Sequence, residues 1–187
     1  MAKQIIECVP NISEGRDLER IDAIVASAKN ISGCKVLGVE PDADYNRTVI
    51  TIAGEPMAVK NAAYNIIEAA IELIDMSKHT GEHPRLGAVD VCPFIPLQNY
   101  TMEQCNDIAN DLAKSIAQDY GVPTFLYGYA ATSPERTLLS SLRKGEYESL
   151  ENRLNDKKIH SPTQKPDYGP NNWTKQAEKS GGIIFRS

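Results

Sequence analysis

The feature that most constrains this chain is an alternation between short apolar runs and longer segments with apolar residues at three- and four-residue spacing. The short runs predict β-strands, and the spaced segments predict amphipathic helices. The predicted strands cover residues 4–10, 34–40, 47–54, 86–97 and 124–131. The predicted helices begin at Asp17, Pro56 and Thr101 and end near Gly33, Asp75 and Gly121, and a shorter one follows Ser133.

The order of the first six elements, β-α-β-β-α-β, is typical of the ferredoxin-like split βαβ fold. The sequence therefore predicts an α+β, two-layer domain with helices on one face of a mostly antiparallel sheet, plus an added helix and strand. From about residue 155 onward the chain is polar and contains three prolines. We therefore predict a folded domain over residues 1–154 and a polar loop or tail over 155–187.

The composition, 41% hydrophobic and 24% charged, is ordinary for a soluble globular protein. A net charge of −5 gives no general attraction to nucleic acid or anionic lipid, so neither is expected as a partner. No apolar run approaches the roughly 18–20 residues that span a bilayer, and the first residues lack a signal-peptide core. A cytoplasmic protein is expected. The four cysteines form no C-x-x-C pair, which favours buried thiols over a zinc or disulfide framework.

The stretch "KHTGEHPRLG" at 78–87 holds two histidines, His79 and His83, four residues apart. With Glu82 they imitate a metal-binding pair on one face of a helix, as in a metal-dependent hydrolase. Gly81 and Pro84 argue against a continuous helix, and no third ligand is evident, so no metal is expected. A polar connection between a helix and a strand is the ordinary alternative.

Catalysis is the other interpretation of this loop. The following apolar strand fixes one end of it, and the proline restricts the backbone beside His83. A histidine held in this way can accept and return a proton near neutral pH. Arg85 and Lys78 add positive charge that suits a carboxylate substrate.

Two further segments are candidate binding sites. In "CVPNISEG", Asn11, Ser13 and Glu14 lie before the first helix, whose N–H groups can hold an anion or a polar ligand. The alternative there is an ordinary helix cap formed by Ser13 or Asn11. The second segment, "DADYNRTV", contains Asp42, Asp44, Asn46 and Arg47 and is otherwise a hydrophilic loop between strands.

Taken together, these motifs resemble a known family. The matching stretches are "ECVPNISEG", "NRTV", "DMSKHTGEHPRLGAVDVCPFIPL" and "PDYGPNN", in that order, from about Ile5 to Asn172. They are similar to the N-terminal subdomain of glutamate formimidoyltransferase, a family that includes the transferase half of formimidoyltransferase-cyclodeaminase. The resemblance implies a cytoplasmic enzyme of histidine breakdown that moves a formimidoyl group from N-formimidoyl-L-glutamate to N5 of tetrahydrofolate, releasing glutamate. Tetrahydrofolate is then a co-substrate, and no metal is needed.

The resemblance also implies roles for individual residues. The family's catalytic histidine lies in G-E-H-P-R, which places it at His83 and leaves His79 as a neighbour. A family carboxylate beside the histidine corresponds to Glu40 or Asp42. The implied substrate- and folate-binding residues are Arg47, Lys78 and Arg85 for carboxylates, Asn11 and Glu14 for the pterin or for orienting the histidine, and Gly169, Pro170, Asn171 and Asn172 for the folate.

Family members have two ferredoxin-like subdomains with the folate in a groove between them, and they form dimers. After "PDYGPNN" this sequence continues for only fifteen residues, so the second subdomain is expected to come from elsewhere. The expected partner is a second copy, in a homodimer, or a separate second-subdomain polypeptide. The alternative is a non-catalytic folate-binding or assembly module.

Overall fold

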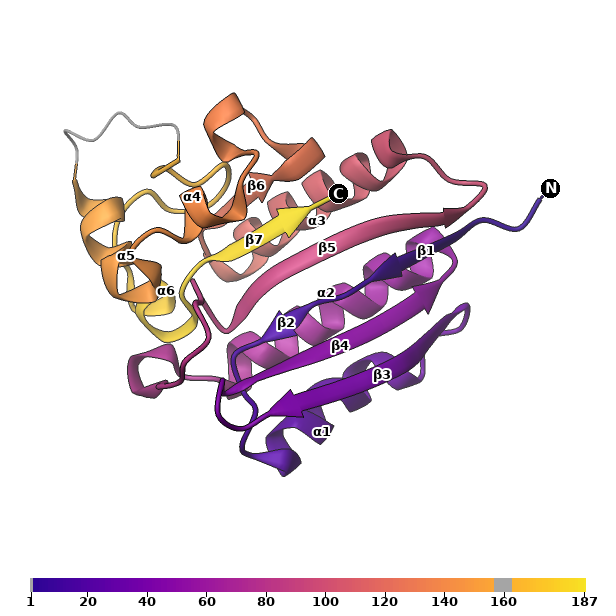
Figure 1. The fold of residues 1–187 in the computed structure, drawn as a ribbon, viewed down its shortest axis with the longest axis horizontal. Coiled ribbons are helices and arrows are strands. Elements are labelled where there is room, and N and C mark those ends of the chain that lie inside the picture. Colours follow the sequence, from indigo (N-terminus) through magenta and orange to yellow (C-terminus); the bar gives the residue numbers. More distant parts are fainter. Residues whose placement is uncertain (1, 157–162) are drawn as a thin grey trace.

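A computed structural model describes residues 2–156 and 163–187 and contains a seven-stranded sheet (Figure 1). The strands are β1 (Ile5–Cys8), β2 (Asn11–Ile12), β3 (Cys34–Asp42), β4 (Arg47–Gly54), β5 (Val89–Gln98), β6 (Thr124–Tyr127) and β7 (Ile183–Arg186). β1 and β2 lie in succession along one line between β4 and β5 and pair antiparallel with both, while β3 pairs antiparallel with β4. The resulting order, β5, β1/β2, β4, β3, is that of the predicted ferredoxin-like unit.

Three long helices cover one face of this sheet, as predicted. They are α1 (Leu18–Lys29), α2 (Pro56–Leu73) and α3 (Met102–Tyr120). Their apolar sides form the main core with inward-facing strand residues such as Ile6, Ile50 and Phe94, each fully buried. The four cysteines are buried and free, which confirms the prediction of buried thiols.

Local sequence signals explain where these helices begin and end. The Thr101 side chain accepts a hydrogen bond from the Gln104 backbone N–H, and the Gln104 side chain accepts one from the Thr101 N–H, so the predicted capping box is present. Gly121 ends α3 in the left-handed conformation, with φ of 65°. The N-cap of α1 is Asp17, so the suggestion that Ser13 or Asn11 caps this helix is wrong.

The prediction of a loop or tail over 155–187 is wrong for residues 175–187. There α6 (Lys175–Ser180) leads into β7, which lies between β5 and β6 and runs parallel to both. Ile184 and Phe185 are fully buried. The sequence "GGIIFRS" is consistent with the start of a strand, but the segment before it is polar, four residues are too few to show a period, and their burial depends on two distant neighbours.

A second helical layer covers the opposite face at the β5–β7–β6 end of the sheet. It contains α4 (Leu139–Arg143), α5 (Glu146–Asn155) and α6, which form a smaller apolar cluster with Val91, Phe125 and Ile184. Short 3-10 turns, η1 (Met76–Lys78), η2 (Gly128–Ala130) and η3 (Pro134–Arg136), join the larger elements. Helices therefore lie on one face of the ferredoxin-like part and on both faces of the added part (Figure 1).

Candidate functional site

In the described part of the chain, α1 and α2 cover one face of the sheet formed by β1 to β4, and no helix covers its opposite face (Figure 1). Along β1 and β4, fully buried residues alternate with half-buried ones, so the second face is accessible. At one end of this open face, the turn between β3 and β4 meets the loop over residues 78–88. The candidate site lies at that meeting point.

Asn46 joins the turn to the loop. It has a positive φ of 51°, and its side-chain amide donates to the Thr80 carbonyl at 2.8 Å while its Oδ1 accepts from the Gly15 N–H at 2.9 Å. The two backbones approach so closely that a Cβ at Gly81 would lie 2.6 Å from the Tyr45 carbonyl oxygen. Glycine is therefore required at Gly81, and the loop is fixed against the turn.

His79 is engaged through both ring nitrogens. Its Nδ1 accepts from Arg85 Nε at 3.1 Å, so its Nε2 bears the hydrogen and donates to the Asn46 carbonyl oxygen at 3.1 Å. Burial is the largest cause of its lowered pKa, which also favours the neutral ring. His79 holds the loop in place and has no ring nitrogen left for a substrate or a metal.

Arg85 is buried, with only 5% of its surface exposed. Its five N–H groups go to His79 Nδ1, the His79 carbonyl, Glu146 and twice to Glu148, at 2.7–3.4 Å. These contacts tie the loop to the start of α5. The structure thus places Arg85 in a structural network, away from the role of a carboxylate receptor that the sequence suggested.

His83 differs from His79 in having both ring nitrogens unbonded within the described residues. Its ring is half-buried and meets the Tyr45 ring edge-on, with centroids 6.4 Å apart, and Arg47 lies over the same tyrosine at 5.8 Å. Burial, and then the positive charges of Arg143, Arg47 and Arg85, lower the pKa of His83 to about 4. The imidazole is therefore neutral at pH 7 and available to accept a proton.

Asn11 and Arg47 lie on the neighbouring strands β2 and β4, where Asn11 pairs with Val49 two residues along from Arg47. Asn11 Oδ1 and Arg47 Nε are buried and make no hydrogen bond within the part of the chain that the structure describes. Leaving such groups unpaired costs roughly 1–3 kcal/mol each. An unpaired acceptor and an unpaired donor on adjacent strands make this place a candidate for hydrogen bonds to a ligand.

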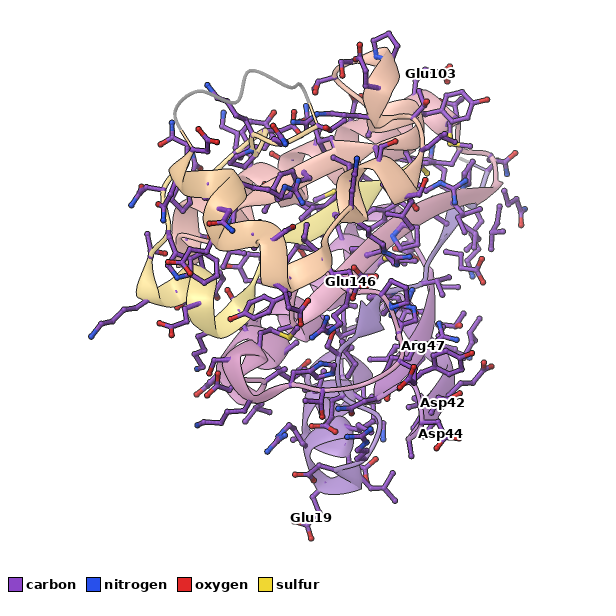
Figure 2. All side chains as sticks on the ribbon, turned by 60° about the vertical axis from the view of Figure 1, so that its left-hand side comes forward. Glu19, Asp42, Asp44, Arg47, Glu103 and Glu146 are labelled. Carbon is purple, nitrogen blue, oxygen red and sulfur yellow. The ribbon has the colours of Figure 1, made fainter. Side chains whose placement is uncertain are left out.

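The predicted orienting carboxylates, Glu40 and Asp42, lie on β3, which pairs with the strand that carries Arg47. Figure 2 shows Asp42, Asp44 and Arg47 together, and Asp42 pairs with Arg47 across β3 and β4. Asp42 Oδ1 accepts from the backbone N–H groups of Asp44 and Tyr45, at 3.1 and 3.0 Å, so Asp42 orders the turn. Glu40 is exposed on β3. Neither carboxylate bonds to His83 within the described residues.

Glu14 and Lys78 line a separate hollow of about 310 Å³ beside His79. Glu14 accepts from the Arg16 and Asp17 N–H groups at 3.0 Å and from Arg20 at 2.5 Å. Burial alone would raise the pKa of Glu14, but these hydrogen bonds outweigh it and the pKa is lowered. Lys78 is 82% exposed and paired with Asp75 at 2.9 Å. Both residues therefore have local partners away from His83.

The predicted folate segment, 169–172, lies between the start of β6 and the end of α5. A Cβ at Gly169 would lie 2.5 Å from the Val122 carbonyl oxygen. Trp173, which follows the segment, donates its backbone N–H to Asn155 Oδ1 at 3.0 Å. Asn171 lines a hollow of about 110 Å³ next to Arg153. Within the described residues, no hydrogen bond, ion pair or ring contact joins this segment to His83, so the predicted residues do not form a single site.

Asp90 is a residue near the candidate site that the sequence analysis did not single out. The pairing of β2 with β5 passes from Val91 to Val89, so Asp90 is an extra, bulged residue. Asp90 Oδ1 accepts from the Leu86 N–H at 2.9 Å and also binds Arg143. A charged residue inside the apolar run "LGAVDVCPF" was the available signal, since an aspartate is rarely buried without a partner.

These features define a class of protein: a ferredoxin-like α+β domain with an open sheet face, at one end of which a loop holds a neutral imidazole among arginine charges. Residues 5–184 match the family described as "Formiminotransferase domain, N-terminal subdomain". The chain belongs to this family, which confirms the family predicted from the motifs.

Relatives with established names support the same family assignment. The chain is 48% identical over 167 residues to formimidoyltransferase-cyclodeaminase of Dictyostelium discoideum, covering 89% of this chain and 30% of the relative. It is 44% identical over 169 residues to glutamate formimidoyltransferase of Streptococcus pyogenes serotype M1, covering 90% of this chain and 54% of the relative. The enzyme of the same name from Thermoplasma acidophilum is 43% identical over 168 residues, with 89% and 54% covered. The chain thus spans 30% to 54% of the length of these relatives.

Within residues 2–156 and 163–187, no helix has the length and apolar character needed to cross a membrane. In the same part of the chain, no three His, Cys, Asp or Glu side chains are grouped as metal ligands would be.

Proposed function

We propose that this protein acts in formimidoyl transfer from N-formimidoyl-L-glutamate to N5 of tetrahydrofolate, giving 5-formimidoyltetrahydrofolate and L-glutamate. The observation that carries the proposal is the state of His83: neutral, half-buried, unbonded at both ring nitrogens within the described residues, and close to arginines. The names of the relatives support the reaction. Tetrahydrofolate enters as a co-substrate, and no step requires a metal.

His83 serves both halves of the reaction. The lone pair on N5 attacks the formimidoyl carbon and forms a tetrahedral intermediate, and the proton that N5 loses passes to the imidazole. The bond from that carbon to the glutamate nitrogen then breaks, and the imidazolium returns the proton to the departing nitrogen. A group that starts neutral is required for the first half, and the lowered pKa of His83 meets this requirement.

Asn11 and Arg47 bind the substrates beside His83. The unpaired Oδ1 of Asn11 is an acceptor for a pterin N–H, and the unpaired Nε–H of Arg47 is a donor for a carboxylate. Asn11 and Arg47 belong to strands of the open part of the sheet, and a second copy of the chain or a separate second-subdomain polypeptide would cover that face. We place the protein in the cytoplasm.

The test is a turnover assay with tetrahydrofolate and N-formimidoyl-L-glutamate. It is run on the chain alone and with an added polypeptide that carries the remaining half of the Streptococcus relative. We expect His83→Ala to lower the rate roughly 100-fold or more, because it removes the proton carrier. Glu82→Gln is the matched control, since Glu82 is the exposed neighbour. Equal rates in His83→Ala and wild type would refute the assignment.

The second candidate is a non-catalytic folate-binding or assembly module. Its supporting observation is that the unpaired Asn11 Oδ1 and Arg47 Nε can hold a ligand whether or not a reaction follows. If tetrahydrofolate binds to the chain while neither arrangement in the assay produces 5-formimidoyltetrahydrofolate, the module is the correct function.

A further inference from the structure

Asp90 and Arg143 form an ion pair at the edge of the candidate site. Arg143 directs two guanidinium nitrogens at this one carboxylate, with Nε 3.3 Å from Oδ1 and Nη2 in contact with Oδ2. The Asp90 side chain is only 2% exposed and that of Arg143 is 18% exposed. The buried carboxylate therefore holds the guanidinium in a single orientation and leaves its outer edge at the surface.

The N–H groups on the solvent-facing side of the Arg143 guanidinium are available for hydrogen bonds to a ligand. Its Nη1 makes no hydrogen bond within residues 2–156 and 163–187, and it is not among the buried unpaired atoms, so it reaches solvent. Arg85 is the contrasting case, since all of its N–H groups are used internally. An arginine that is anchored on one side and open on the other can receive a carboxylate with little loss of side-chain entropy.

Arg143 also lies close to the reacting group proposed above. Asp90 binds both Arg143 and the backbone of Leu86, three residues after His83, so a single carboxylate connects α4 to the histidine loop. Among the charged groups that lower the pKa of His83, Arg143 contributes most, ahead of Arg47. The positive charges of these two arginines therefore act on the imidazole and make its surroundings attractive to anions.

We propose that Arg143, oriented by Asp90, binds a carboxylate group of the formimidoyl donor and so selects a glutamate-type substrate. This inference rests on the proposed transfer reaction. Arg143 thereby takes the role of carboxylate receptor that the sequence suggested for Arg85. Arg143 contacts the substrate, and Asp90 is a positioning residue that acts through it.

Binding measurements test this without requiring turnover. N-formimidoyl-L-glutamate is titrated into the purified protein by calorimetry, with N-methylformamidine as a probe that lacks carboxylates. The variant is Arg143→Lys, because a lysine keeps a positive charge against buried Asp90 but cannot hold two carboxylates in a fixed fork. Lys144→Gln is the matched control, since it removes the adjacent exposed charge.

We expect Arg143→Lys to weaken binding of N-formimidoyl-L-glutamate by about 10- to 100-fold, the loss of one or two charge-assisted hydrogen bonds. Lys144→Gln should change it less than about twofold, as expected for a surface substitution. Equal donor affinity in Arg143→Lys and wild type would overturn the proposal, as would a wild type that binds N-methylformamidine as tightly as the donor. Folding is checked for each variant by thermal unfolding.

Asp90→Asn is a second variant that keeps the shape of the buried side chain. We expect it to weaken donor binding as well, because the orientation of Arg143 is lost. The proposed reaction is judged separately, by turnover in wild type and His83→Ala. If donor binding depends on Arg143 and no transfer occurs, the carboxylate site stands and the transfer reaction fails.

Discussion

Replacing Arg85 with methionine distinguishes a structural arginine from a substrate-binding one. Methionine keeps much of the apolar stem of arginine but removes every N–H of the guanidinium. Glu146 and Glu148, whose side chains are 39% and 63% exposed, can then be hydrated by water. His79 Nδ1 loses its donor in a half-buried place where water has limited access.

The expected loss of stability follows from these contacts. The two partly exposed ion pairs contribute roughly 0–1 kcal/mol each. The unsatisfied acceptor on His79 costs about 1–3 kcal/mol. The sum is roughly 1–5 kcal/mol, which lowers Tm by roughly 2–20 °C in a chain of this size. The affinity for the formimidoyl donor should fall only to the extent that loss of the Arg85 hydrogen bonds loosens the loop that carries His83.

The assay is thermal unfolding of Arg85→Met beside wild type, followed by calorimetric titration of the donor well below both Tm values. Arg143→Lys should show the opposite pattern, with a small change in Tm and a large loss of donor affinity. An Arg85→Met variant that melts within about a degree of wild type but binds the donor tenfold more weakly would refute the reasoning. In that case Arg85 would be the carboxylate receptor that the sequence suggested.

Three further predictions concern His83, two glycines and two buried cysteines. Because His83 must be neutral to accept a proton and its pKa lies near 4, kcat/KM should rise with pH through about 4 and then level off; a midpoint near 6.5 would contradict this. Gly15→Ala places a Cβ 2.1 Å from a backbone carbonyl oxygen and should cost about 3 kcal/mol or more in denaturant unfolding. Gly121→Ala meets no atom within 4 Å and should cost only about 1–2 kcal/mol for its positive φ, so equal losses would be evidence against the packing argument. Burial raises the pKa of the Cys8 thiol, which lies 3.6 Å from Cys92, so both should react with a thiol reagent only on unfolding, and rapid labelling of the native protein would be inconsistent with this.

Local signals in the sequence determined the ferredoxin-like part of the fold. The capping box at Thr101 and Gln104, the proline at the start of α2 and the glycine after α3 each act within a few residues, so they are legible without the structure. The motif "GEHPR" likewise directed attention to His83, because it lies in one continuous stretch.

Tertiary structure alone decided which polar groups are available. Arg85 and Arg143 are equally charged in the sequence, yet one is saturated by glutamates 61 and 63 residues away, and the other keeps an open edge beside a bulged aspartate. β7 became a central strand for the same kind of reason, since β5 and β6 provide its hydrogen-bonding partners. Pairings of this kind depend on sheet register and on contacts between distant segments, and a single sequence records neither.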